Sequence, residues 1–203
     1  MAKLSVGKCL PPTAGVALLS AVENKDLKML ELFAPIHGVY PEGDPYKLRD
    51  LVHAARDCQV KMVKILVRYG DETTIESAVA TIPPTTSVAV FNLLLEKSNS
   101  DARKRIFCNL AAKGFVNLAG RLLDRMDAMT LRWALLSAAS NGHFDMVKML
   151  LRKVDTVSVD CALEAAAIKG ELDVVELLRG WCSSRGLSDA VSSAGSNGHE
   201  EVV

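Results

Sequence analysis

Two histidines of this chain, His143 and His199, follow glycine in the same tripeptide, Asn-Gly-His. Imidazole is a frequent zinc ligand and a frequent general base, so this step could carry metal or proton-transfer chemistry. Both chemistries need partner groups at short, fixed distances. The other two histidines, His37 and His53, lie in no cluster of histidine, cysteine or carboxylate residues. The elements that hold His143 and His199 therefore decide whether either can react.

Other signatures of catalysis are absent from the sequence. It has no glycine-rich phosphate loop, no G-x-S-x-G step and no H-E-x-x-H motif, and we expect no bound cofactor or metal. The cysteines are odd in number and have no short zinc or redox spacing: Cys9, Cys58, Cys108, Cys161 and Cys182. This pattern favours reduced thiols packed as small buried hydrophobic residues over a disulfide framework. At Cys58, a reactive thiol is the alternative to a tolerated substitution.

The charge balance argues against two classes of partner. Lys+Arg and Asp+Glu are equal at 24 each, so the chain has no overall attraction to nucleic acid or anionic lipid. No apolar run reaches the ~18 residues of a membrane span. The start, "MAKLSVGKCLPPTAG", is a poor secretory signal because Lys8 and two prolines interrupt its apolar stretch. We expect a soluble intracellular protein, located in the cytoplasm.

A 28-residue repeat organises the chain. Glycine recurs at this interval, as do two apolar columns: Gly114, Gly142, Gly170 and Gly198; Val63, Phe91, Ala119, Val147, Val175 and Val203; Leu66, Leu94, Leu122, Leu150 and Leu178. An earlier copy, residues 18–33, is followed by a longer linker around "HGVYPEGDPY". The spacing predicts six near-complete units and a truncated seventh over residues 15–203, after an N-terminal segment, residues 1–14. No separate second domain is indicated.

Each unit is expected to be a pair of short helices. In the fifth unit, four apolar residues recur at helical spacing and predict one buried face: Phe144, Val147, Leu150 and Leu151. Gly142 is expected in the left-handed region at the end of the first helix. Thr130 and Ser158 share a column that could cap the first helices. Such short pairs bury their apolar faces only against neighbouring units, so the sequence predicts an all-α solenoid.

The repeat also answers the histidine question at the level of sequence. The column of His143 and His199 holds Gln59, Ser87, Phe115 and Glu171 in other units, and the two histidines lie two units apart. At ordinary helix spacing this separation is about 20 Å, too far for a shared metal. We therefore interpret both as polar residues at helix starts.

These residues resemble the second half of ankyrin repeats, small-small-x-x-Gly-His-x-x-Val-Val-x-x-Leu-Leu. The pattern stands as "AASNGHFDMVKMLL" from Ala138, "AAIKGELDVVELL" from Ala166 and "AGSNGHEEVV" from Ala194, and more loosely as "AARDCQVKMVKIL" from Ala54. The chain departs from the family in lacking the Thr-Pro-Leu-His signature and in having units about five residues shorter than the usual ~33. The missing residues belong to the finger between units, which gives the first-helix face more weight in partner contact.

The third unit is irregular. Its first helix is expected to stop at Ile82-Pro83-Pro84, and the loop "TIPPTTS" replaces the glycine turn. Phe91 and Leu94 nevertheless keep the phase of the second helix. The loop is either a lengthened turn or a partner contact.

The resemblance implies a non-catalytic scaffold or adaptor that binds a protein through its first-helix face and loops. The candidate contacts are polar or aromatic positions in or just after first helices: Arg56, Asn109, Lys113, Trp133, Ser137, Ser140, Asn141 and Lys169. For Trp133, burial in the core is the alternative. We expect no nucleic-acid, membrane or small-molecule partner.

Other functions remain open from the sequence. Because Val202 and Val203 would be uncovered at the end of a solenoid, the chain could be the regulatory or targeting region of a larger enzyme or microbial effector. Nucleic-acid binding through the basic residues of the second and fourth units is a third, weaker alternative. The uneven charge along the array is either a solvated face or a polar binding surface.

Overall fold

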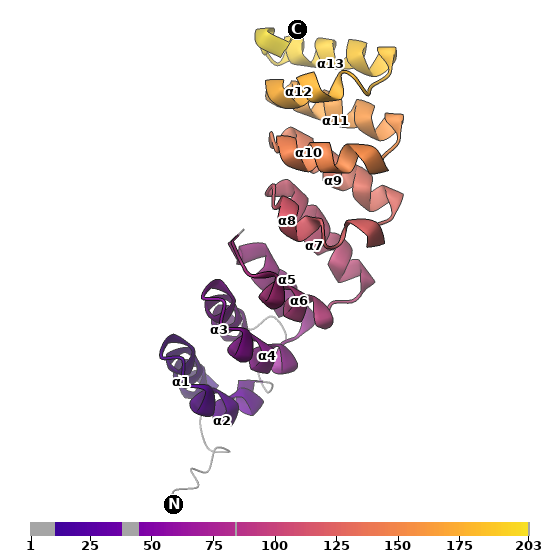
Figure 1. The fold of residues 1–203 in the computed structure, drawn as a ribbon. Helices are drawn as coiled ribbons and strands as arrows, with labels where there is room; N and C mark the ends of the chain where they lie inside the picture. Colours follow the sequence, from indigo (N-terminus) through magenta and orange to yellow (C-terminus); the bar gives the residue numbers. More distant parts are fainter. Residues whose placement is uncertain (1–10, 38–44, 84, 203) are drawn as a thin grey trace, which may run out of the picture. The chain divides into compact units, whose positions relative to one another are not determined.

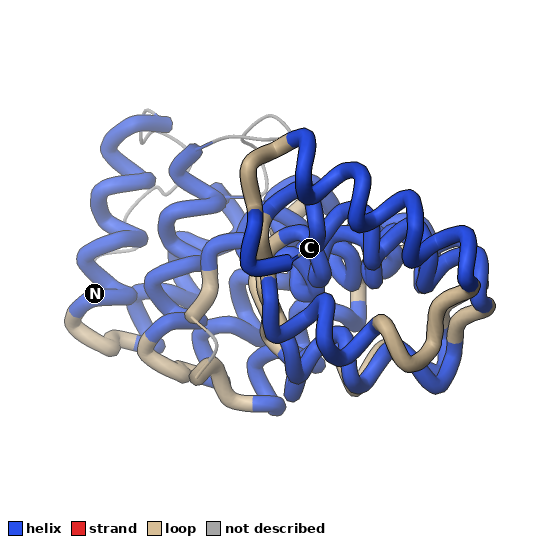
Figure 2. Tube along the Cα trace, turned by 90° about the horizontal axis from the view of Figure 1, so that it is seen from above, coloured by secondary structure: helices blue, strands red, loops and turns tan. Residues whose placement is uncertain are grey.

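The computed structural model describes residues 11–37, 45–83 and 85–202, and every regular element within them is a helix. Successive helices form antiparallel pairs that stack in sequence order, as Figures 1 and 2 show for each part of the chain. The contacts divide the chain into two compact units, Met1–Arg103 and Lys104–Val203. The predicted all-α fold of ankyrin-like stacked helix pairs is confirmed.

The first compact unit holds three helix pairs. Their bounds are α1 (Pro11–Glu23), α2 (Leu27–His37), α3 (Pro45–Arg56), α4 (Val60–Tyr69), α5 (Glu72–Thr81) and α6 (Val88–Glu96). First helices pack on first helices, in the order α1, α3, α5, and second helices on second helices, in the order α2, α4, α6. Each pair is thus covered by its neighbours, as expected for helices too short to bury their apolar faces alone.

The second compact unit repeats this arrangement. Its first helix, α7, begins before the boundary between the units and continues after it. Its elements are α7 (Ser100–Ala112), α8 (Val116–Ala119), η2 (Leu123–Arg125), α9 (Ala128–Ser140), α10 (Phe144–Leu150), η3 (Leu151–Lys153), α11 (Thr156–Lys169), α12 (Leu172–Leu178), α13 (Ser184–Ser196) and η4 (Glu200–Val202). The first helices α9, α11 and α13 form one layer, and α8, α10, α12 and η4 form the other.

Two predicted features fall partly outside the described residues. Helix α1 begins at Pro11, within the predicted N-terminal segment, while residues 1–10 are not described. The long first linker around "HGVYPEGDPY" likewise lies largely outside the described ranges, which resume at Pro45. The array boundary at residue 15 therefore stays a prediction.

The linkers between units are short, as the 28-residue period predicts. Between η3 and α11, the chain has two residues, Val154 and Asp155, where a longer unit would carry a finger. In the third unit, α5 ends at Thr81, Ile82 is extended, and Phe91 and Leu94 are buried in α6, which confirms the phase. Pro84 is not described.

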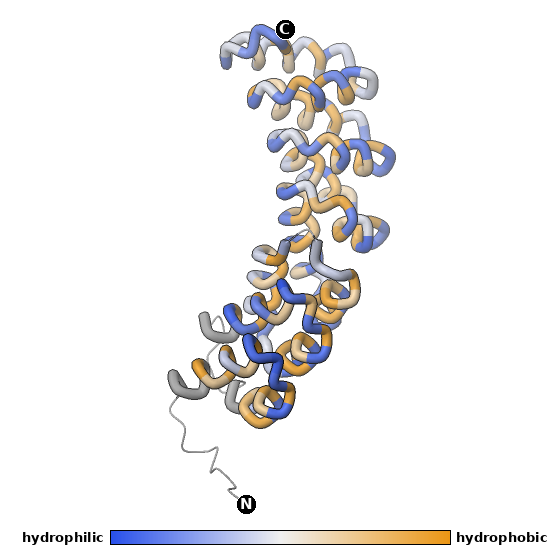
Figure 3. Tube along the Cα trace, turned by 60° about the vertical axis from the view of Figure 1, so that its left-hand side comes forward, coloured by the Kyte–Doolittle hydropathy of each residue, from blue (hydrophilic) through white to orange (hydrophobic). Residues whose placement is uncertain are grey.

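The apolar core lies between the two helix layers and between successive pairs. Hydrophobic and hydrophilic residues alternate along the helices (Figure 3). In α10, Val147 and Leu150 are buried as predicted, whereas Phe144 is 38% exposed and Met146 is buried in its place. The prediction for Phe144 is therefore wrong. At about 100° per residue, the buried arc is centred between Leu150 and Val147, and Phe144 falls at its edge.

A capping residue that recurs every 28 positions begins the first helices. Asp127 and Asp155 have extended backbones and accept hydrogen bonds from the backbone N–H groups of Thr130 and Ser158, at 2.8 and 2.9 Å. Three residues of the same column act alike in other units: Asp71, Asn99 and Ser183. The prediction that Thr130 and Ser158 are the caps is thus wrong. They lie inside the first turn, buried, and receive the cap.

The stability of the fold should depend on pH through the Asp127 cap. The ion pair with Lys104 Nζ, at 2.7 Å, and the hydrogen bonds from Thr130 hold the pKa of Asp127 well below its usual range. A carboxylate with a lowered folded-state pKa stabilises the fold above its unfolded-state pKa of about 4, and this stabilisation is lost as the pH falls through the folded-state value. Asp127→Asn keeps an N-cap oxygen, as Asn99 does, but has no carboxylate to protonate. We therefore expect this variant to lose less stability than the original protein when the pH is lowered. Urea midpoints by circular dichroism at about pH 7 and about pH 3 would test it; equal acid losses in both proteins would contradict it.

The turns between the helices of a pair use the left-handed region. Gly142 has φ +70°, as predicted, and the corresponding glycines of three other units have similar values. Cys58 (φ 54°) and Lys25 (φ 57°) occupy the same turn position in the first two pairs. A residue with a Cβ is strained there, so Cys58 is a tolerated but costly replacement of glycine.

Candidate functional site

The two histidines hold neighbouring repeats together. Nε2 of His143 lies 2.8 Å from the carbonyl oxygen of Ala112, and Nε2 of His199 lies 2.9 Å from that of Ile168. A carbonyl oxygen can only accept, so Nε2 carries the proton and donates. Each imidazole therefore binds the C-terminal end of the first helix in the preceding repeat, and this contact accounts for the histidine in the Asn-Gly-His step.

Two other residues of this column also reach the end of the first helix in the preceding pair. Nε2 of Gln59 donates to the carbonyl oxygen of Val22 at 3.4 Å, and the carboxylate of Glu171 lies against the backbone of Gly142. Within the described residues, no group of three or more histidine, cysteine or acidic side chains is placed to hold a metal ion.

The four cysteines that the structure describes are free thiols. The prediction that they are buried is wrong: Cys58 is exposed, and Cys108, Cys161 and Cys182 are partly exposed. Cys108 and Cys161 lie in the first helices α7 and α11, whereas Cys58 and Cys182 lie in turns. Partial burial, with the charge of Asp127, raises the pKa of the Cys108 thiol, which disfavours the thiolate needed for nucleophilic chemistry.

A hollow of about 560 Å³ lies on the first-helix face of the second compact unit, between α9 and α11. Its lining is mostly apolar: Met129, Arg132, Trp133, Leu136, Cys161, Glu164, Ala165 and Ile168. We call these eight residues the α9–α11 groove. Met129 and Trp133 are 60% and 57% exposed. The opposite side of α9 supplies the core through Ala134, Leu135 and Ala138, so the packing of the fold does not require apolar side chains on the groove side.

The charged residues of the α9–α11 groove are held differently. Nη2 of Arg132 donates to Sγ of Cys161 at 3.2 Å, across the groove. Hydrogen bonds from Ser158, together with the positive charge of Arg132, lower the pKa of Asp155 at the start of α11. The guanidinium is therefore already engaged by groups of α11.

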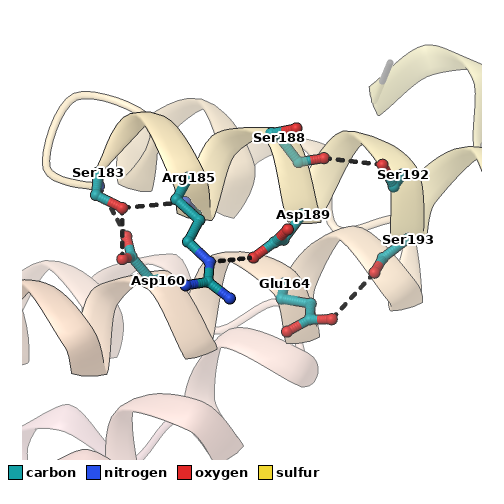
Figure 4. A network of polar contacts seen from close by, with 9 residues as sticks. Asp160, Glu164, Ser183, Arg185, Ser188, Asp189, Ser192 and Ser193 are labelled. Carbon is teal, nitrogen blue, oxygen red and sulfur yellow. Dashed lines mark hydrogen bonds and ion pairs between the residues drawn. The ribbon is translucent and has the colours of Figure 1, made fainter.

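Glu164 lies on the other flank of the groove, toward α13. Ser193 Oγ donates to its Oε1 at 3.1 Å, as Figure 4 shows. The same figure shows Asp160 accepting from the backbone N–H and hydroxyl of Ser183, at 2.8 and 2.7 Å. Asp160 is thus committed to the start of α13, whereas Glu164 has a single neutral donor.

The structure brings some of the predicted contact residues close to this groove. Trp133 lines it and is exposed, so the alternative that it is buried in the core is excluded. Ser137 follows one turn later on α9, and Lys169 is exposed at the end of α11. Ser140 Oγ and Asn141 Nδ2 donate to the carbonyl oxygen of Ser137, at 3.1 and 2.7 Å. The side chains of Ser140 and Asn141 thereby complete the helix end.

The remaining predicted residues lie elsewhere. Asn109 is partly buried and Lys113 is exposed at the end of α7, outside the groove lining. Arg56 is exposed at the end of α3 in the first compact unit. The sequence interpretation missed Met129, Leu136, Glu164 and Ile168. The sequence contained a signal for those on α9. Once its paired alanines are assigned to the core, the opposite side of the helix is expected to be polar, but that side carries Met129 and Leu136.

Comparison with known families identifies the repeat. Residues 131–162 match the model described as "Ankyrin repeat". The match spans most of α9, all of α10 and the first half of α11, which together contain Trp133, Leu136 and Cys161 of the groove. It confirms the resemblance to divergent ankyrin repeats that the sequence predicts. A comparison with curated proteins gives no match.

The matched repeat implies a broad class of function. Ankyrin repeats are protein–protein interaction modules and are typically non-catalytic. Among the described helices, none is both long enough and apolar enough to cross a membrane.

Proposed function

We propose that this chain is a non-catalytic scaffold or adaptor that binds a protein partner on the first-helix face of its second compact unit. The observation that carries this proposal is the exposed apolar lining of the α9–α11 groove, led by Trp133 and Met129. Exposed apolar residues gathered in one hollow, on a side of the helix that the core does not use, are typical of interaction sites.

The polar candidates fit a rim around this groove. Ser137 and Lys169 lie on the two helices that form it, and polar rims surround the apolar centres of protein interfaces. Asn141 and Ser140 contribute by ordering the end of α9. We place Lys113 and Asn109 at the edge of the surface rather than at its centre, and we do not assign Arg56, in the first compact unit, to this surface.

The proposal is tested by comparing variants in affinity capture. Ser137→Trp combined with Lys169→Trp places two bulky side chains on the rim without touching the core, so we expect them to obstruct the groove and cause loss of the partner with an unchanged melting temperature. Lys148→Trp on α10 is the matched control, because Lys148 is exposed on the second-helix layer. Equal recovery of the same partner by all three proteins, or unfolding of the double variant, would contradict the assignment.

A regulatory or targeting region of a larger enzyme or effector is the alternative function. It predicts the same binding surface and differs in what lies beyond residue 203, so the full reading frame discriminates the two. A catalytic domain encoded downstream would support the alternative.

A further inference from the structure

The two charged side chains of the α9–α11 groove are engaged unequally, and this difference indicates which partner the groove suits. Its two ionised side chains are Arg132 and Glu164. Arg132 donates to Cys161 and acts on Asp155 of its own chain. Glu164 is exposed and, among the described residues, has the hydroxyl of Ser193 as its hydrogen-bond partner and no paired cation. The positive charge of Arg132 thus acts on Asp155, and Glu164 is the ionised side chain of the groove that has no opposite charge paired with it among the described residues.

This charge lies beside the apolar side chains of the groove. Trp133, Leu136 and Ile168 line the same hollow as Glu164. The face of an indole ring attracts cations, and the aliphatic stem of a lysine or arginine packs well on apolar side chains while its head reaches a carboxylate. A basic residue can therefore use both features at once, whereas an acidic residue would meet a like charge.

Resting on the proposed function, we infer that the α9–α11 groove recognises a peptide segment of its protein partner that presents an apolar anchor next to a lysine or arginine. The apolar anchor packs on Trp133 and Ile168. The basic side chain crosses toward Glu164 and pairs with its carboxylate. Electrostatic complementarity of this kind selects partners more than it adds affinity.

Three synthetic peptides test the inference on the full chain. They share two leucine anchors and differ at two flanking positions, which are both lysine, both glutamine or both glutamate. In a Trp181→Phe background, Trp133 is the single tryptophan, so its emission reports occupancy of the groove. We expect the lysine peptide to bind about tenfold more tightly than the glutamate peptide, with the glutamine peptide between them.

Variants of Glu164 assign the discrimination to this residue. Glu164→Gln should remove most of the difference between the peptides, and Glu164→Lys should reverse their order. Glu176→Lys, an exposed position on α12, makes the same charge change outside the groove and should leave the order intact. An order that Glu164→Lys does not change, or that Glu176→Lys changes equally, would overturn the inference.

The outcomes separate this inference from the proposed function. If all three peptides bind equally and all shift the emission of Trp133, the groove binds peptides and the charge selection is wrong. If none binds, the inference is overturned, and the capture experiment with the Ser137 and Lys169 variant decides the proposed function independently.

Discussion

Replacement of Gly114 by alanine should lower the free energy of unfolding by about 2–3 kcal/mol. Gly114 has φ +69°, where a residue with a Cβ loses about 1–2 kcal/mol. A Cβ would also stand 2.9 Å from the imidazole ring of His143. The ring would have to move, and its hydrogen bond to Ala112 would weaken by about 0.5–1.5 kcal/mol.

A double-mutant cycle separates the two causes. His143→Ala removes the ring, so Gly114→Ala in that background should retain the backbone strain alone and cost about 1–2 kcal/mol. Gly198→Ala is the matched control for strain, because it has φ +78° and a Cβ there would meet nothing within 4 Å. Urea unfolding of the four proteins of the cycle measures the coupling. Additive losses would show that His143 does not press on Gly114.

Replacement of Trp133 by alanine should weaken partner binding about thirtyfold while leaving the melting temperature unchanged. Large aromatic side chains at the centre of a hollow commonly supply 2 kcal/mol or more of binding free energy. At 57% exposure, Trp133 contributes little to the core, so the fold should not depend on it. Titration of the partner recovered by affinity capture, together with a thermal melt of each protein, measures both quantities.

The chain offers a matched control for this prediction. Trp181 is 53% exposed and lies between α12 and α13, outside the residues that line the groove. Trp181→Ala should therefore leave partner affinity unchanged. If both replacements weaken binding equally, or if Trp133→Ala lowers the melting temperature by several degrees, the groove is not the centre of the interface.

The repeat and the helix pairs could be predicted from the sequence because their signals are local and periodic. The glycine column reports a single backbone conformation, and Gly142 adopts it as predicted. Helical spacing of Val147 and Leu150 reports one buried face. The capping column also follows the repeat, since Asp127 and Asp155 are 28 residues apart. The prediction chose the column of Thr130 instead, because threonine and serine are also common N-cap residues.

The candidate site depended on contacts between repeats. A first helix has neighbours on two sides, so its sequence alone does not decide which apolar residues those neighbours cover. Trp133 was therefore equally compatible with the core and the surface until α11 was placed beside α9. The hydrogen bond from Arg132 to Cys161 likewise joins residues of different repeats, and the groove brings Glu164 of α11 beside Trp133 of α9.

By itself, the sequence determined the architecture of this protein: helix pairs every 28 residues, four of them with glycine in the turn between the two helices, which must stack because each pair is too short to bury its own apolar face. The tertiary structure decided where the surface is free. Packing one first helix against the next covers the alanine side and exposes the side with Met129 and Trp133, and burial of this kind is a property of neighbouring repeats rather than of any single one.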